Sequence, residues 1–144
     1  MVSPYHSVVD LTQQESNMSL EQVIKINRPG RGETDNQKIN ISGGIAMFRR
    51  DAIQKIGGWN EDFIGWGGED DFQTMKVKNF LTWTELQARC FHLYHERGMP
   101  DMKWYQRNLD LLTKTSQMDK SQLQKVILNQ LPKIGMKNKY DNFI

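Results

Sequence analysis

The sequence has little of several features that would place it in a specialised class. It has one cysteine, Cys90, so no disulfide can form within the chain, which fits a reducing compartment. No apolar run approaches the roughly 18 residues of a membrane span, and no basic-then-apolar leader opens the chain. The formal net charge is +2, so we expect no nucleic-acid partner. We expect a cytoplasmic protein, with a peripheral contact at the inner membrane left open.

The composition predicts one small α/β domain. The chain has 144 residues, 38% of them hydrophobic, which is enough for a modest core. Hydrophobic spacing predicts a buried strand at 45–48, a strand ending near 94, and helices at 49–56, 69–80, 101–117 and 119–131. We expect the last two helices to pack as an antiparallel pair on a sheet. Helix 101–117 should face inward with Met102, Tyr105, Leu109 and Leu112. In helix 69–80 we expect Lys76 and Lys78 to face solvent.

The most informative stretch is 57–71, which holds five glycines and two tryptophans and ends in three carboxylates. Glycines at this density indicate tight turns or a close approach of the backbone to a ligand. Three adjacent acids, Glu69, Asp70 and Asp71, repel one another, and such crowding raises the pKa of at least one of them. An ordinary helix start, where the helix macrodipole stabilises acidic side chains, explains the three acids equally well. It does not explain the two Gly-Trp pairs.

A second group of reactive side chains is the pair His92 and His95. Two histidines three residues apart ligate one metal only if the chain turns between them, because a straight strand points them to opposite faces. On the residues alone, metal ligands and ordinary surface histidines both remain open.

Three segments resemble the catalytic half of a glycosyltransferase family. They are Gly43-Gly44-Ile45-Ala46-Met47-Phe48-Arg49, Gly57-Gly58-Trp59-Asn60-Glu61-Asp62-Phe63 and Gly65-Trp66-Gly67-Gly68-Glu69-Asp70-Asp71. In this order and spacing they are similar to the β-1,4-galactosyltransferases and their bacterial relatives of capsule synthesis and chondroitin polymerisation. The resemblance implies the C-terminal half of a GT-A fold, in which a small mixed sheet packs against helices.

The resemblance also implies the chemistry and the residues that carry it. A sugar would move from a UDP-sugar donor to a hydroxyl of an acceptor glycan, with inversion, and Asp70 would be the general base. The implied substrate-binding residues are Glu69, Asp71, Trp66, Gly67, Gly68, Gly43, Gly44 and Ile41. Ile41 replaces a tyrosine that crowds the 2-position of the donor sugar, which favours N-acetylhexosamine over galactose.

The family also binds a divalent cation, so the resemblance implies Mn²⁺, or Mg²⁺ in its place. His95 stands where the family has a histidine ligand, and His92 stands where the galactosyltransferases have a methionine ligand. Imidazole is a harder ligand than a thioether. We therefore predict His95 as a metal ligand and His92 as a second one.

One family feature is missing, because no Asp-x-Asp motif occurs in the sequence. In the family this motif lies in a nucleotide-binding half that precedes the present segments. We therefore expect a catalytic half that needs a separate N-terminal nucleotide-binding half, has little activity alone, and is able to self-associate through uncovered surface. The predicted organisation is a segment and mobile loop at 1–38, a catalytic core at 39–100, and a helical pair with a tail at 101–144.

Two other functions remain in competition. A non-catalytic module that binds carbohydrate or a protein partner could keep the acidic turn without nucleotide binding. A metal hydrolase using His92, His95 and an acid is weaker, because no third ligand stands at a recognised spacing.

Overall fold

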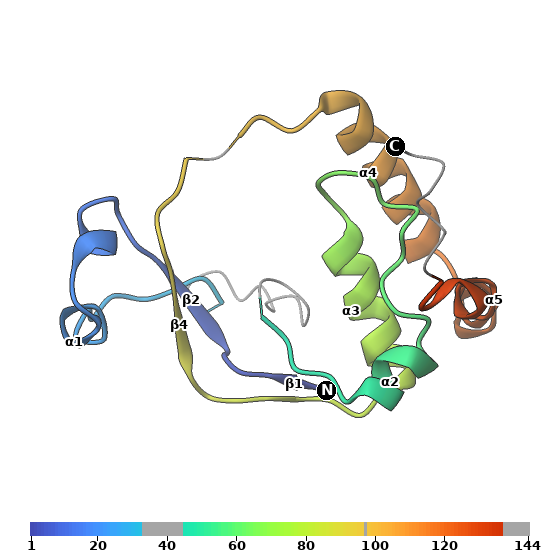
Figure 1. Ribbon diagram of the computed structural model, residues 1–144, viewed down its shortest axis with the longest axis horizontal. Helices are drawn as coiled ribbons and strands as arrows, with labels where there is room; N and C mark the ends of the chain where they lie inside the picture. Colours follow the sequence, from blue (N-terminus) through green and yellow to red (C-terminus); the bar gives the residue numbers. More distant parts are fainter. Residues whose placement is uncertain (33–44, 97, 137–144) are drawn as a thin grey trace.

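The computed structural model describes residues 1–32, 45–96 and 98–136. Short paired strands gather on one side of the molecule, and the longer helices gather on the other (Figure 1). The elements are β1 (Val2–Ser3), β2 (Ser7–Asp10), η1 (Glu15–Asn17), α1 (Leu20–Val23), α2 (Arg50–Lys55), α3 (Glu69–Phe80), β3 (Thr84–Glu85), β4 (Arg89–His92), α4 (Met102–Ser116), α5 (Lys120–Gln130) and η2 (Leu131–Lys133). Within these residues no helix is both long and apolar enough to span a lipid bilayer.

The strands form two separate two-stranded sheets, and both pairs are parallel. β1 pairs with β3, placing Val2 opposite Thr84, and β2 pairs with β4, placing Asp10 opposite His92. Parallel partners need a long connection, and here α1, α2 and α3 all lie between them in sequence. The α/β class is therefore confirmed, while the GT-A assignment stays a prediction.

The strand side has a small apolar core of its own. Val9 of β2 and the following Leu11 are 1% and 4% exposed and cluster with Val23 of α1. Phe91 of β4 packs against this cluster from the neighbouring strand. The strand side also has an ion pair, in which Arg28 donates hydrogen bonds to both carboxylate oxygens of Glu15, at 2.5 and 2.9 Å.

The buried strand predicted at 45–48 is wrong. Met47 makes one isolated antiparallel bridge to Val2, and the two residues exchange both backbone hydrogen bonds at 2.9 Å. Ile45 and Met47 are 54% and 56% exposed. An apolar run of four residues carries too little periodicity to show whether another layer covers it.

Helix α3 is the centre of the helical side, and its bounds agree with the prediction. Two apolar clusters each join one residue of α3, one of α5 and one of the segment between α2 and α3: Phe72, Leu123 and Phe63 in the first, and Val77, Ile127 and Ile56 in the second. Burying a side chain such as Phe72 contributes about 1.5–3 kcal/mol. These clusters hold the start of α3 in place, which matters for the site below.

The two C-terminal helices pack on α3 and not on a sheet. Leu111 and Leu112 of α4 contact the cluster around Phe72, and Figure 1 shows α4 and α5 beside α3 and away from the paired strands. The sheets are only two strands wide, so they offer no face broad enough to receive a helical pair. The predicted packing partner is therefore wrong, although both helices form where the spacing placed them.

Two side chains lie on the opposite side of their helix from the one predicted. Lys76 of α3 is fully buried, whereas Lys78 is exposed as expected. Met102, predicted to point inward, is 59% exposed at the first turn of α4. The Lys76 ammonium donates to Gly58 O at 2.5 Å and to Gln130 Oε1 at 3.5 Å, and burial lowers the pKa of Lys76 to about 8. A buried lysine with specific acceptors cannot be recognised from helical spacing, because the acceptors come from remote segments.

Candidate active site at the start of helix α3

The turn before α3 needs glycine at two adjacent positions. Gly67 and Gly68 have φ angles of 108° and 87°, which L side chains rarely adopt. A Cβ at Gly67 would lie 2.9 Å from the Tyr105 ring, and one at Gly68 would lie 2.9 Å from the Phe63 ring. The turn therefore packs closely against α4 on one side and against the apolar core on the other.

Asn108 of α4 holds the backbone of the same turn through side-chain hydrogen bonds. Its side chain is fully buried, accepts a hydrogen bond from Ile64 N at 3.3 Å, and donates to Ile64 O at 2.9 Å and Trp66 O at 3.2 Å. These bonds satisfy backbone groups that the glycine-rich turn leaves unpaired. The sequence analysis missed Asn108. Its signal was a polar residue three positions after Tyr105, on the face of α4 predicted to be buried.

Trp66, directly before the two glycines of the turn, supplies a flat aromatic surface. Its ring stacks on Tyr105 of α4, with the centroids 5.6 Å apart and an angle of 17° between the planes. Trp66 is nevertheless 60% exposed. An aromatic ring supported on one side and open on the other is suited to stacking against the apolar face of a sugar ring.

The three acids on the first turn of α3 have different surroundings. Glu69 accepts a hydrogen bond from Gly67 N at 2.9 Å, so it braces the turn. Asp71 is exposed. Asp70 lies between them, and burial, with the charges of Glu69 and Asp71 added, raises its pKa from 3.8 to about 6. Burial is the largest cause of this shift and the charges of the two neighbouring acids add to it, and Asp70 is the residue predicted to be the base.

Tyr5 is a buried tyrosine between β1 and β2. The residue is 5% exposed, and burial raises the pKa of its phenol, with smaller contributions from the charges of Cys90 and Asp70. The sequence analysis did not select Tyr5, and an isolated tyrosine in an extended segment gives no pattern that would identify it.

The two histidines lie together at the end of β4. Their ring centroids are 5.2 Å apart at an angle of 67°, so the chain does turn between them. His92 Nδ1 is 3.2 Å from Asp10 Oδ1, and Asp10 also pairs with Arg31 at 2.8 Å. Across the described ranges, no group of three or more His, Cys, Asp or Glu side chains is arranged to hold a metal ion.

The remaining predicted site residues lie outside the described part of the chain. Ile41, Gly43 and Gly44 belong to residues 33–44, so their predicted place beside the donor sugar stays a prediction. The described site consequently has the acids, the glycine turn and Trp66 in one group and the two histidines in another.

An acidic helix start behind a glycine-aromatic turn is compatible with a transferase site, and comparison with known families points to the same class. Residues 33–96 match the family model described as the N-terminal domain of galactosyltransferase, which is less than half of the chain but includes the acidic turn and both histidines. The match supports a galactosyltransferase-like glycosyltransferase family. Its description names an N-terminal domain, so the C-terminal half inferred above stays a prediction. No solved structure matches the chain.

Proposed function

We propose that the chain carries the acceptor-side catalytic site of a glycosyltransferase, with Asp70 as the general base. The observation that carries this proposal is the raised pKa of Asp70, to about 6, at the start of a helix inside the matched segment. A base works best when its pKa lies near the operating pH. At pH 7 Asp70 is mostly ionised, yet it holds a proton more firmly than an ordinary aspartate.

The proposed reaction is an inverting displacement on a UDP-sugar. The acceptor hydroxyl oxygen attacks the anomeric carbon, its proton passes to an Asp70 carboxylate oxygen, and the bond to the UDP oxygen breaks. Glu69 and Asp71 would bind sugar hydroxyls, and Trp66 with Gly67 and Gly68 would line the pocket. This pocket would hold the two reactants in line. Gly43, Gly44 and Ile41 would complete the donor side, with N-acetylhexosamine favoured over galactose.

A divalent cation, Mn²⁺ or Mg²⁺, is part of the proposal. His95 and His92, whose rings lie 5.2 Å apart, would supply two ligands. Imidazole is more typical of Zn²⁺ and Cu²⁺ sites, so the oxygen ligands that Mn²⁺ and Mg²⁺ prefer would come from other groups. The described residues do not complete a three-ligand site on their own. A nucleotide-binding half would provide the others. When bound, the cation would neutralise charge on the diphosphate leaving group.

A transfer assay on the full chain, supplemented with the nucleotide-binding half that it is expected to need, tests the assignment of the base. Wild type and Asp70→Asn would receive Mn²⁺, a soluble glycan acceptor panel and either UDP-N-acetylhexosamine or UDP-galactose, with UDP release as the readout. Loss of general-base catalysis should lower kcat by about 10²–10⁴-fold. UDP affinity, measured by calorimetry, should not change.

The matched control is Asp110→Asn, which removes a carboxylate from the exposed side of α4. It should keep the wild-type kcat. Turnover close to wild type in Asp70→Asn would overturn the base assignment. Glycan binding by wild type, with neither UDP binding nor UDP release, would instead favour a non-catalytic carbohydrate-binding module.

A further inference from the structure

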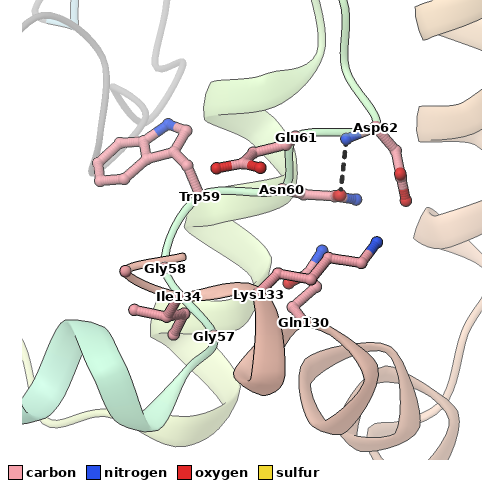
Figure 2. A pocket seen from close by; sticks show the side chains of 10 residues that line it. Gly57, Gly58, Trp59, Asn60, Glu61, Asp62, Gln130, Lys133 and Ile134 are labelled. Atoms are coloured by element: carbon pink, nitrogen blue, oxygen red, sulfur yellow. Dashed lines mark hydrogen bonds between the residues drawn. The ribbon is translucent and has the colours of Figure 1, made fainter. Parts of the chain in front are cut away.

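A cavity lies between the turn at 57–62 and the C-terminal end of α5, and it shares no residue with the 65–71 turn (Figure 2). Its volume is about 130 Å³. Sites for ordinary small-molecule ligands are larger, at roughly 300–1,000 Å³. A cavity of this size is suited to a single sugar ring or a smaller molecule. Asn60–Asp62 line one side, and Gln130 and Lys133 line the opposite side.

The cavity contains a buried donor that the fold points into it. Gln130 is 8% exposed, and its Nε2 has no hydrogen-bond partner among the described residues. The Lys76 ammonium can only donate, so the Gln130 Oε1 at 3.5 Å must face it and Nε2 must face away. Gly57 makes this packing possible, because a Cβ there would lie 3.1 Å from Gln130 Oε1.

The charges around the cavity select the kind of ligand. Lys133 lies on one side, and the carboxylates of Glu61 and Asp62 lie on the other. An anion would meet the two carboxylates, and a cation would meet the ammonium group and the Gln130 N–H. A ligand with hydroxyl groups satisfies both kinds of partner, because a hydroxyl both donates and accepts. Trp59, 42% exposed, adds aromatic surface at the rim.

We propose that this cavity binds one uncharged sugar residue of a glycan, with Gln130 Nε2 donating to a ring hydroxyl. The site is separate from Asp70 and needs neither nucleotide nor metal. It would hold a part of a glycan chain that is not reacting. The proposal therefore holds whether the chain is a transferase or a binding module.

The test is an NMR titration of the full chain labelled with ¹⁵N. The probes are the methyl glycosides of galactose, glucose, N-acetylglucosamine and N-acetylgalactosamine, each followed into the millimolar range expected for one sugar ring. At least one should produce saturable shifts in the Gln130 side-chain amide, the Trp59 indole N–H and the Gly58 backbone amide. The same shifts should appear in Asp70→Asn, so failure of the transferase proposal would be seen separately.

The diagnostic variant is Gln130→Glu. Glutamate keeps an oxygen for Lys76 but loses the N–H donor, so the dissociation constant should rise about tenfold or more. Gln124→Glu makes the same change of charge at an exposed position of α5 and should bind as wild type does. If Gln130→Glu does not fold, the wild-type shift map decides alone.

Three outcomes would overturn the proposal. The first is the absence of saturable shifts at the cavity with all four sugars. The second is unchanged affinity in a folded Gln130→Glu variant. The third is an equal response of the cavity to inorganic phosphate or Mg²⁺ alone, which would show an ion site in place of a sugar site.

Discussion

Two carboxyl groups on opposite sides of the molecule are shifted in opposite directions. On the strand side, the hydrogen bonds from Arg28 lower the pKa of Glu15 to about 2. On the helical side, burial and two neighbouring acids raise the pKa of Asp70 to about 6. Glu15 is stabilised as an anion and holds two segments together. Asp70 is kept close to its protonation point and is suited to moving a proton.

The same contrast applies to the way the two candidate groups are supported. The acidic turn rests on buried Asn108, on Tyr105 and on the apolar cluster around Phe72. His95 is exposed beyond the end of a two-stranded sheet. The proposed base thus has packed support within this chain, whereas the proposed metal site would need further ligands. Four sets of variants test this difference between the two sides of the molecule.

The largest expected effect is on metal binding by the histidines. In the chain supplemented with a nucleotide-binding half, His95→Ala should lose Mn²⁺ binding in the presence of UDP. His92→Ala should weaken it by at least the roughly 10–100-fold that removing a group outside the ligand shell costs at other metal sites. Asp70→Asn should leave Mn²⁺ affinity unchanged. Calorimetric titration measures all three. Loss of Mn²⁺ binding in Asp70→Asn would show that the acids and the histidines form one site.

The next effect concerns the buried lysine of the helical side. Lys76→Ala leaves a cavity and removes the donor to Gly58 O and Gln130 Oε1, so it should cost about 2–4 kcal/mol of unfolding free energy. Lys78→Ala, two positions further along α3 on its exposed face, should change the free energy of unfolding by about 0.5 kcal/mol or less. Urea denaturation compares them. Equal losses would mean that Lys76 is not buried in solution.

A smaller loss is expected from the residue that fixes the acidic turn. Asn108→Ala removes three hydrogen bonds to Ile64 and Trp66 and should cost about 1–3 kcal/mol. Near-ultraviolet circular dichroism should also change, because the Trp66–Tyr105 stack rests on this turn. Asn129→Ala, at an exposed position of α5, is the control. If Asn108→Ala were as stable as wild type, the role assigned to Asn108 in supporting the acidic turn would be wrong.

The smallest effect is the pH dependence of stability at Asp70. Its folded pKa of about 6 exceeds the ordinary value of 3.8, so the fold disfavours the charged form. This cost is absent below about pH 4, grows as the pH rises through 6, and is complete above it. Asp70→Asn should therefore match wild type at pH 3.5 and have a Tm a few degrees higher at pH 8. If Asp70→Asn and wild type had the same Tm at pH 8 as well as at pH 3.5, the raised pKa of Asp70 would be contradicted.

The sequence predicted an unusual acidic turn, whose catalytic role stays a prediction, but it did not predict the groups that support this turn. Repulsion among Glu69, Asp70 and Asp71 follows from adjacency, and the glycines before them predict an unusual backbone. The contribution of Asn108 comes from a segment that is distant in sequence. No local pattern shows that an amide on α4 will bind the backbone of this turn.

The sequence by itself determined the local elements, because capping residues, glycines and apolar spacing act within one helical turn. It set α3 at Glu69–Phe80, the cap before α5 at Asp119, and the glycine that follows α2 at Gly57. Only the tertiary structure decided that Lys76 is buried, that α4 and α5 pack on α3, that Ile45 and Met47 are exposed, and that Gln130 faces a cavity. Burial and electrostatic environment depend on which remote segments come together, and those contacts set the pKa of Asp70.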